Sequence, residues 1–176
     1  MQIRFLFPFL LIGLLMIGAW IGYSRYTTKQ ELELAYTIIP SIQVVSLNGE
    51  FVDLKLQALD NLSVLIYFNS TCSICQSEAE LIESTFRADT LTRFLWVSSE
   101  PMEEVRNFAV ESRLDSLSSH HFFSDTLYGL ANAFRLTGVP ATFVYDGEGH
   151  LVDYTLGAVS MSDLTLSIQK AHDRAR

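Results

Sequence analysis

The two cysteines of this 176-residue chain, Cys72 and Cys75, are three positions apart, where an apolar run gives way to a helical pattern. The unpaired amides and the macrodipole of a helix N-terminus favour an anion, so we expect the first thiol to ionise more readily. The thiolate is the nucleophile of thiol–disulfide exchange. Because a bridge between these residues closes a very short loop, a purely structural disulfide would gain little chain entropy. The pair therefore indicates redox cycling.

Two other interpretations of the cysteine pair compete with redox cycling. Half of a zinc site would need two more ligands, but the chain has no second C-x-x-C. Its histidines begin 45 residues beyond Cys75, at His120, His121, His150 and His172. We therefore expect no metal and no organic cofactor. The second interpretation is two unrelated core cysteines, since free cysteine is commonly buried.

The elements around the cysteines predict an α/β layered domain with a mixed sheet. Val64–Phe68 is a continuous apolar run, typical of a central strand covered on both faces. Residues 73–87 have the apolar spacing of a helix, and Pro101 opens another through Arg113. The other expected strands are 94–97, 120–123, 141–145 and 151–155, and the other expected helices are 128–134 and 160–172.

A β-hairpin is expected before the central strand. Residues 42–45 and 50–54 flank Asn48-Gly49, a pair that readily takes the positive φ values of a type I′ turn. A second turn, at residues 146–149, joins the last two strands.

The N-terminal segment is expected to be a membrane anchor. Residues 5–23 form 19 positions without a charge, and a helix of that length spans roughly 28 Å, close to the hydrocarbon thickness of a bilayer. A cleaved signal peptide is the alternative, but this run is long and offers only a poor cleavage triplet, residues 22–24. The expected organisation is an anchor at 1–23, a polar stalk at 24–39 of uncertain helicity, and one domain at 40–176.

Charge restricts the partners of the domain. All 20 acidic residues and 11 of the 12 lysines and arginines follow residue 23, which gives that part a net charge of −9. This balance argues against a general nucleic-acid-binding face. The numbers of positive charges on the two sides of the anchor are nearly equal, so they do not determine its orientation in the membrane. The cysteine chemistry favours a domain outside the cytoplasm, and we expect a single-pass protein of the inner membrane with a periplasmic, monomeric C-terminal domain.

From about Pro40 to the C-terminus, the sequence resembles the thioredoxin fold. Within that fold, the sequence more closely resembles the branch of membrane-anchored, extracytoplasmic TlpA-like thiol-disulfide oxidoreductases. It rests on the hairpin, on Cys72-Ser73-Ile74-Cys75 after the central strand, and on Gly138-Val139-Pro140 before a strand. The spacing of 64 residues between Cys75 and Pro140 matches the branch that inserts an extra helix and strand. The resemblance implies a thioredoxin-like mixed sheet flanked by helices.

The resemblance also implies roles for particular residues. In the family, the proline that matches Pro140 is cis and lies against the cysteine pair, and the backbone of the residue that matches Val139 pairs with the substrate chain. Ser73 and Ile74, between the cysteines, would also face the substrate. A proline that merely ends a strand edge is the other reading of Pro140.

Departures from the family pattern leave the proton acceptor open. Thr71 replaces the usual tryptophan before the first cysteine, Ser73-Ile74 replaces a proline-containing pair, and Ile66 replaces the buried acid of minimal thioredoxin. Glu78 corresponds to a glutamate that the cytochrome-maturation branch places near its thiols, and one helical turn keeps it on the side of Cys75. Its alternative is a solvated helix glutamate.

The sequence thus predicts a membrane-tethered protein that exchanges disulfides with extracytoplasmic protein substrates and with a membrane redox donor or acceptor. The expected catalytic residues are Cys72, Cys75 and Glu78. Peroxide reduction is not favoured, because residues 68–71 lack the proline that peroxiredoxins place ahead of their cysteine. The alternative function is a redox-passive binding module at the membrane surface.

Overall fold

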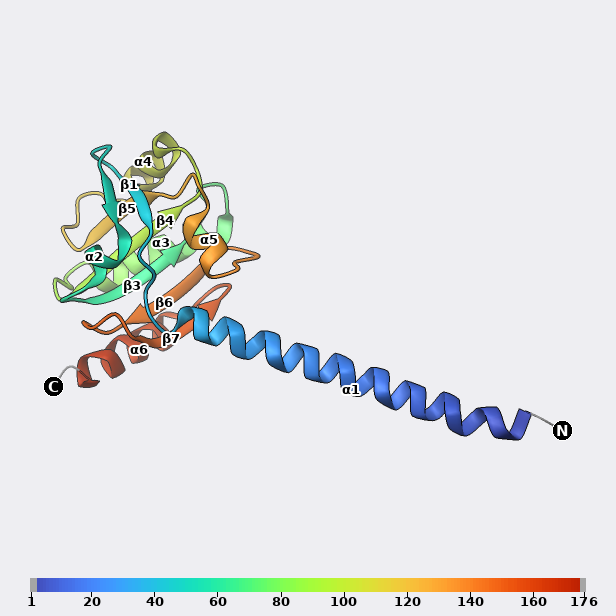
Figure 1. Ribbon diagram of the computed structural model, residues 1–176. Coiled ribbons are helices and arrows are strands. Elements are labelled where there is room, and N and C mark those ends of the chain that lie inside the picture. The colour runs from blue at the N-terminus through green and yellow to red at the C-terminus, as the bar shows by residue number, and fades with distance from the viewer. Residues whose placement is uncertain (1–2, 175–176) are drawn as a thin grey trace. The chain divides into compact units, whose positions relative to one another are not determined.

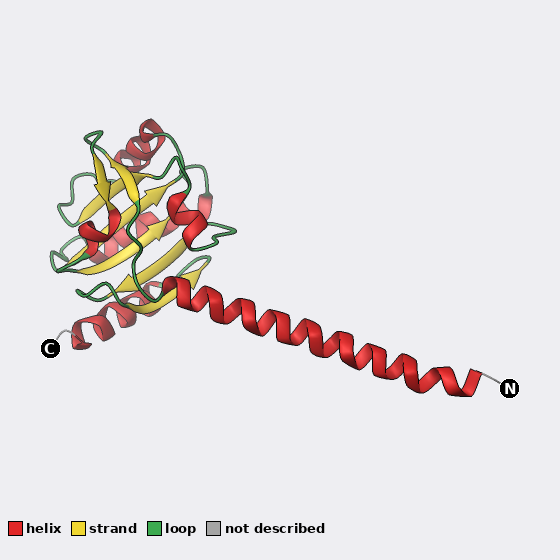
Figure 2. Cartoon of the chain, viewed as in Figure 1, coloured by secondary structure: helices red, strands yellow, loops and turns green. Residues whose placement is uncertain are grey.

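The computed structural model describes residues 3–174, and it describes their side chains except for residues 3–11, 25 and 28–33. The chain divides into two compact units, Met1–Ala35 and Tyr36–Arg176. The second unit contains all seven strands of the sheet (Figures 1 and 2).

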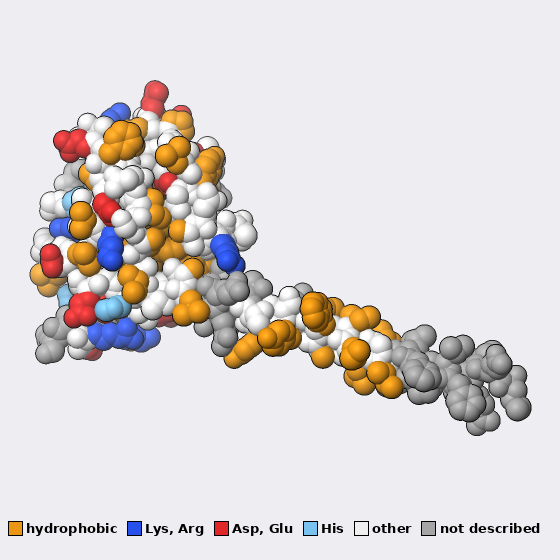
Figure 3. Space-filling model, in the orientation of Figure 1, with side chains coloured by type: hydrophobic (Ala, Val, Ile, Leu, Met, Phe, Trp, Pro, Cys, Tyr) orange, Lys and Arg blue, Asp and Glu red, His pale blue; other side chains and the backbone are white. Residues whose placement is uncertain are grey.

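Helix α1, Ile3–Tyr36, makes up the described part of the first unit, so the chain is helical through most of the predicted stalk. Figure 3 shows hydrophobic side chains gathered along its described portion. No helix in the described part of the chain combines the length and the apolar content needed to cross a membrane. The structure does not describe the side chains of residues 5–11, which belong to the expected membrane span. The membrane anchor therefore stays a prediction.

The second unit is a seven-stranded mixed sheet with the strand order β2-β1-β5-β4-β3-β6-β7. The strands are β1 Gln43–Ser46, β2 Phe51–Asp53, β3 Leu62–Tyr67, β4 Thr92–Ser98, β5 His120–Ser124, β6 Ala141–Tyr145 and β7 Leu151–Leu156. The helices are α2 Leu54–Ala58, α3 Ser73–Phe86, α4 Met102–Glu111, α5 Gly129–Ala133 and α6 Met161–Arg174. The predicted α/β layered domain is confirmed, and α2 is the helix that the sequence pattern did not predict.

The strand directions determine which loops share one end of the sheet. Strands β3, β4 and β5 are parallel neighbours, whereas β6 runs antiparallel to β3 with Ala141 opposite Tyr67. The start of β6 therefore lies at the end of β3, where the chain turns into the cysteine segment. Pro140 and the residues that precede Cys72 are brought to the same end of the sheet by this pairing.

The predicted hairpin forms, but the type I′ turn was wrong. Gly49 has a φ of 81°, whereas Asn48 has no positive φ. The N–H of Gly49 donates to the Ser46 carbonyl at 2.8 Å, and the N–H of Ser46 donates to the Glu50 carbonyl at 2.9 Å. A type I turn followed by a left-handed glycine also suits the strand twist, and it requires only one positive φ value.

The core that supports the cysteine segment lies on one face of the sheet. A single cluster of buried apolar side chains contains residues of β3, β4, β5 and β6 together with residues of α3, α4 and α6. Cys75 belongs to this cluster, as does Ile66, which is 1% exposed. These three helices therefore cover the face of the sheet against which the cysteine helix packs (Figure 1).

The opposite face has a second core, built on aromatic rings. Tyr36 packs edge-on against Phe134 and Phe143, with ring centroids 5.1 and 5.0 Å away. Its hydroxyl donates to the Phe134 carbonyl at 3.0 Å, and the Tyr145 hydroxyl donates to the Tyr36 carbonyl at 3.1 Å. Tyr36 and Ile39, each 1% exposed, thus belong to the core of the second unit although they precede Pro40.

Candidate active site

Cys72 and Cys75 lie at the N-terminus of α3, as the sequence predicts. Cys72 is the N-cap residue, with extended backbone angles, and its Sγ accepts the backbone N–H of Cys75 at 3.3 Å. An amide hydrogen bond and the positive end of the helix dipole are both favourable for negative charge on that sulfur. The local arrangement is therefore suited to a nucleophilic thiolate at Cys72.

The two thiols differ in exposure. Cys72 is partly exposed, whereas Cys75 is 1% exposed. Burial raises the pKa of the Cys75 thiol to about 12, helped by its hydrogen bond with Cys72 and by the nearby charges of Cys72 and Glu78. A backbone hydrogen bond at Asn69 acts in the opposite direction on this pKa. A disulfide in solution can therefore reach the first thiol, while the second stays protonated inside.

The loop between β3 and α3 is held by its own side chains. The Asn69 Oδ1 atom accepts the N–H and the hydroxyl of Thr71 at 3.0 and 2.6 Å, and the N–H of Cys72 donates to the Asn69 carbonyl at 3.2 Å. Thr71, which stands where the family has tryptophan, thus contributes a turn hydrogen bond. These contacts orient the chain as it enters the helix.

Glu100 is a residue of the site that the sequence reasoning missed. It follows β4, and its carboxylate accepts both the N–H and the hydroxyl of Ser70 at 2.7 Å. The Ser98 hydroxyl donates to the same carboxylate at 2.9 Å, and the Ser124 hydroxyl donates to the Glu100 carbonyl at 2.6 Å. Glu100 therefore ties the cysteine loop to the ends of β4 and β5. The one sequence signal that could have indicated Glu100 is its position as an acidic residue just after the expected strand 94–97.

Glu78 is buried, and the alternative of a solvated helix glutamate is wrong. The residue is 3% exposed on α3. Its Oε1 accepts the Thr142 hydroxyl of β6 at 3.0 Å, and its Oε2 accepts the Val159 N–H, in the loop after β7, at 3.2 Å. Burial raises the pKa of this carboxyl, and these two hydrogen bonds oppose the shift. The site thus contains a buried acid beside a buried thiol, although Ile66 replaces the acid of minimal thioredoxin.

The Val139–Pro140 peptide bond is cis, as the resemblance implies. The Pro140 carbonyl accepts the N–H of Gly157 at 2.8 Å, and Ala141 pairs with Tyr67 and Leu156. The proline is therefore held at the start of β6, between β3 and β7. It lies at the same end of the sheet as the loop that leads to Cys72.

Ser73 and Ile74 occupy the exposed first turn of α3 between the cysteines. Ile74 is 50% exposed, whereas the neighbouring Cys75 is buried. An exposed branched side chain beside Cys72 can contact whatever binds at that residue. The structure thus leaves both residues accessible, and their contact with a substrate stays a prediction.

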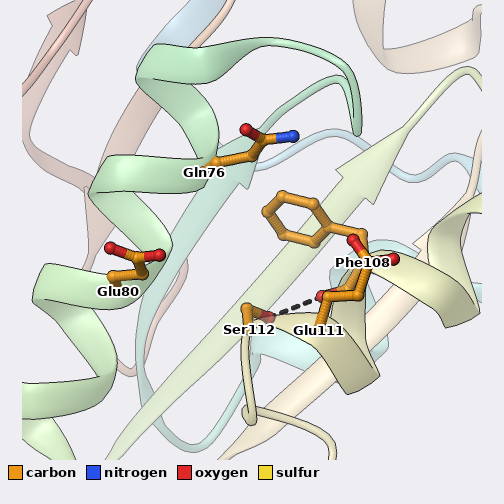
Figure 4. A pocket seen from close by; sticks show the side chains of 5 residues that line it. All are labelled: Gln76, Glu80, Phe108, Glu111 and Ser112. Carbon is orange, nitrogen blue, oxygen red and sulfur yellow. Dashed lines mark hydrogen bonds between the residues drawn. The ribbon is translucent and has the colours of Figure 1, made fainter.

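A shallow groove of about 220 Å³ separates α3 from α4 close to the cysteines (Figure 4). Gln76 and Glu80 line it from α3, and Phe108 and Glu111 line it from α4. The Gln76 side-chain amide donates to the Ser70 carbonyl at 2.8 Å, so this side of the groove also supports the cysteine loop. Among the described residues, no group of three or more His, Cys, Asp or Glu side chains is arranged to hold a metal ion.

Comparisons with known proteins agree on the fold. A secreted disulfide oxidoreductase of Mycobacterium tuberculosis, homologous to Escherichia coli DsbE, is 16% identical with a TM-score of 0.63, covering 73% of this chain and 95% of its own. An uncharacterized thioredoxin-like protein from Porphyromonas gingivalis is 17% identical with a TM-score of 0.64, covering 80% and 95%. Peroxidoxin BcpB from M. tuberculosis is 19% identical with a TM-score of 0.62, covering 77% and 94%. The fold is thioredoxin-like.

No protein-family model matches the sequence, and no curated protein matches it. The structural neighbours include both disulfide oxidoreductases and peroxiredoxin-like proteins, so their likeness defines the fold and leaves the reaction to be argued from the site.

Proposed function

We propose that this protein is a thiol–disulfide oxidoreductase that acts on protein disulfides through Cys72 and Cys75. One observation carries the proposal: a partly exposed sulfur that accepts an amide at a helix N-terminus lies one turn from a buried thiol. Such a pair supports a two-step exchange, in which the accessible thiol attacks and the buried thiol resolves.

The proposed reaction is a thiol–disulfide exchange in two steps. The Cys72 thiolate attacks one sulfur of a substrate disulfide, and the other substrate sulfur leaves as a thiolate that takes a proton from water. Cys75 then gives its proton to the Glu78 carboxylate and attacks the Cys72 sulfur, which releases the second substrate sulfur as a thiolate that also takes a proton from water. The substrate gains two electrons, and the protein is left with a Cys72–Cys75 disulfide. A dithiol redox partner must reduce that disulfide before the next cycle.

The substrate chain is proposed to lie along the edge at Val139 and Pro140 and to contact Ser73 and Ile74. Because proline has no N–H and no polar side-chain atom, this position leaves the thiols without a competing donor or ligand. The exposed Ile74 side chain supports an apolar contact beside the attacked disulfide.

The proposal extends to a location. The uncharged run of residues 5–23 supports an inner-membrane tether, with the domain on the extracytoplasmic side and a membrane redox donor or acceptor as partner. Alkylation with a membrane-impermeant maleimide in intact cells tests it. We expect Cys72 to label without lysis, and labelling that occurs only after lysis would disprove the orientation. Membrane sedimentation that is resistant to high salt tests the tether itself.

Insulin reduction with dithiothreitol tests the activity. We expect the wild-type protein to accelerate precipitation of the insulin B chain, Cys72→Ser to be inactive, and Cys75→Ser to accumulate a mixed disulfide with insulin. Wild-type activity in Cys72→Ser would end the assignment of the nucleophile.

A redox titration separates this function from a passive binding module. A catalytic pair should have a potential above about −300 mV, whereas a structural pair lies below that value and resists the glutathione pool. The same titration determines whether the protein is poised as a reductant or as an oxidant.

A further inference from the structure

Both residues that donate hydrogen bonds to the Glu78 carboxylate line one small cavity that is partly open to the surface. Thr142 and Val159, which hold the two carboxylate oxygens, form part of the wall of a cavity of about 30 Å³. The cavity lies between β6 and β7 on one side and the start of α6 on the other, because its remaining lining residues belong to those elements. It therefore adjoins the buried acid through the residues that bind it.

Besides the apolar side chains of Val144 and Leu164, the walls of the cavity away from Glu78 carry polar side chains that lead to the surface. Thr155 pairs with Thr142 across β6 and β7, and Asp153 lies two residues before it on β7. The Ser167 hydroxyl of α6 donates to Asp153 at 2.7 Å. The Asp153 side chain is 44% exposed and lies 3.7 Å from the Lys170 ammonium group. Two hydrogen-bonded pairs, Glu78 with Thr142 and Ser167 with Asp153, thus flank the cavity, and the second pair reaches solvent.

The cavity has the size and the polar partners that a bound water requires. A polar cavity holds a water molecule when it offers at least about 10–15 Å³ and two to four hydrogen-bonding partners. The volume of about 30 Å³ exceeds that limit, and Thr142, Thr155, Asp153 and Ser167 supply candidate partners. An apolar void of the same size would stay dry.

Glu78 needs such a route because the side that faces the thiols closes during the reaction. Glu78 and Cys75 are 3% and 1% exposed before any substrate binds. In the mixed disulfide, the substrate is attached to Cys72 and covers the exposed thiol. A proton that Cys75 gives to Glu78 must then leave through another side of the carboxyl group.

We propose that the cavity lined by Thr142, Asp153, Thr155, Val159 and Ser167, here called the proton port, holds water through which Glu78 exchanges its proton with solvent. The inference rests on the proposed function, which makes Glu78 the acceptor of the Cys75 proton. Protonated Glu78 donates its proton to the Thr142 oxygen, and Thr142 passes its own hydroxyl proton to the water in the port. That water returns a proton to bulk solvent past Asp153, and no electrons move.

The ionisable groups around this path all lie on elements packed against Glu78 or against the port. They are Cys72 at the N-cap of α3 and Cys75 on α3, Asp153 and Tyr154 on β7, and Asp163 and Lys170 on α6. Asp153 and Asp163 line the port as acids, so a proton that leaves Glu78 meets acceptors rather than cations. Thr142 acts in this scheme as a positioning residue for the proton.

Exchange of the Glu78 carboxyl proton with deuterium measures the port directly. In full-length protein in detergent micelles, the carbonyl band of protonated Glu78 is assigned by infrared difference against Glu78→Gln, and its shift is timed after mixing with D2O. Val159→Leu fills the port with one added methylene and keeps the backbone N–H that binds Glu78. Val159→Ala is the matched control, because it enlarges the port and keeps the same bond.

We expect Val159→Leu to slow exchange about a hundredfold or more, within the range that a positioned proton transfer contributes, and Val159→Ala to exchange as fast as wild type. A wild-type rate in Val159→Leu, or equal slowing in both variants, overturns the proposal. If Val159→Leu does not fold, Thr155→Val and Thr155→Ser give the same test: the first should be slow and the second fast, and equal rates overturn the proposal.

This experiment fails independently of the proposed function, because it requires no disulfide exchange. Slowed exchange in Val159→Leu, together with a wild-type protein that does not reduce insulin, would retain the port and refute the oxidoreductase. A wild-type protein that reduces insulin, together with unchanged proton exchange in Val159→Leu, would retain the oxidoreductase and refute the port.

Discussion

The Glu100 carboxylate accepts two hydrogen bonds from Ser70. The backbone N–H of Ser70 donates to Oε2 at 2.7 Å, and the Ser70 hydroxyl donates to Oε1 at 2.7 Å. Ser70 lies two residues before the nucleophilic cysteine of the proposed reaction. The position of the cysteine loop thus depends on an acid at the end of another strand, 30 residues further along the chain.

Replacing Glu100 with alanine should weaken both the fold and the activity. The substitution leaves the Ser70 N–H, the Ser70 hydroxyl and the Ser98 hydroxyl without their acceptor. Since hydrogen bonds to a charged group contribute about 1.5–3 kcal/mol, we expect the free energy of unfolding in urea to fall by roughly that amount. Insulin reduction should slow as well. Glu80→Ala, an exposed acid of α3, is the control, and equal effects of the two variants would contradict the role of Glu100.

Glu100 also illustrates what the sequence could not predict. The strands, the cysteine helix and the position of Cys72 followed from apolar runs and helix signals, which are local properties. A contact between Ser70 and Glu100 depends on which strands become neighbours, and no pattern in a single sequence specifies that pairing. Glu100 can be read from the sequence as an acid after a strand, but its partner Ser70 cannot.

The buried state of Glu78 shows the same limit. Helical spacing placed it on the side of Cys75, but it could not say whether that side faces solvent or the sheet. Thr142 and Val159, which hold the carboxylate, are more than 60 residues away in the chain. The turn at Asn48-Gly49 is a different case, because two turn types satisfy the same pair and only the flanking hydrogen bonds distinguish them.

Alkylation should distinguish the two thiols of the reduced protein. Iodoacetamide reacts with thiolates, and the buried Cys75 has a pKa raised to about 12. At pH 8 we expect the label on Cys72 first, as located by mass spectrometry, with Cys75 reacting slowly and faster as the pH rises. In 8 M urea (about the concentration that unfolds small domains) both should react. Equally fast labelling of both thiols in the native protein would contradict the assigned burial.

Glu78 should make the native protein less stable as the pH rises. Its pKa is higher in the folded state than in the unfolded state, so its neutral form favours folding below the unfolded pKa. That contribution is lost as the pH rises through the folded pKa. We expect the free energy of unfolding of wild type, minus that of Glu78→Gln, to decrease over this interval in urea titrations. A difference that is constant with pH would mean that Glu78 does not titrate abnormally.

His120 should act in the opposite direction. Burial and the nearby charge of His121, against a smaller opposing effect of Asp89, lower the pKa of this histidine to about 4. The Trp96 indole N–H donates to Nδ1 at 3.0 Å, which requires that nitrogen to be unprotonated. Because the unfolded state binds the proton near pH 6.5, stability should fall as the pH drops from there to about 4.

The size of the His120 effect can be bounded. A pKa change from 6.5 to about 4 corresponds to about 3 kcal/mol at most. His120→Gln keeps an acceptor for Trp96 and removes the titration, so the stability advantage of wild type should shrink as the pH falls through this interval. Glu78 and the carboxyl of Asp125, whose pKa burial also raises, titrate in both proteins and cancel in the comparison. An advantage that grows towards pH 4 would have the wrong sign for a buried neutral histidine.

Tyr36 tests where the folded unit begins. Its ring packs against Phe134 and Phe143, and its hydroxyl donates to the Phe134 carbonyl. Tyr36→Phe removes only the hydrogen bond and should cost about 0.5–1.5 kcal/mol of unfolding free energy. Tyr36→Ala also removes the ring and should cost about 3–5 kcal/mol, as for other buried aromatic side chains.

Leu56→Ala is the control for the Tyr36 variants, because that side chain is 67% exposed and its loss should change stability by less than about 0.5 kcal/mol. All three variants can be compared by urea unfolding followed through tryptophan fluorescence, since Trp96 lies in the core on the other face of the sheet. If Tyr36→Ala were no more destabilising than Leu56→Ala, the aromatic core would not depend on Tyr36. A large loss would mean that a chain cut at Pro40 lacks part of its own core.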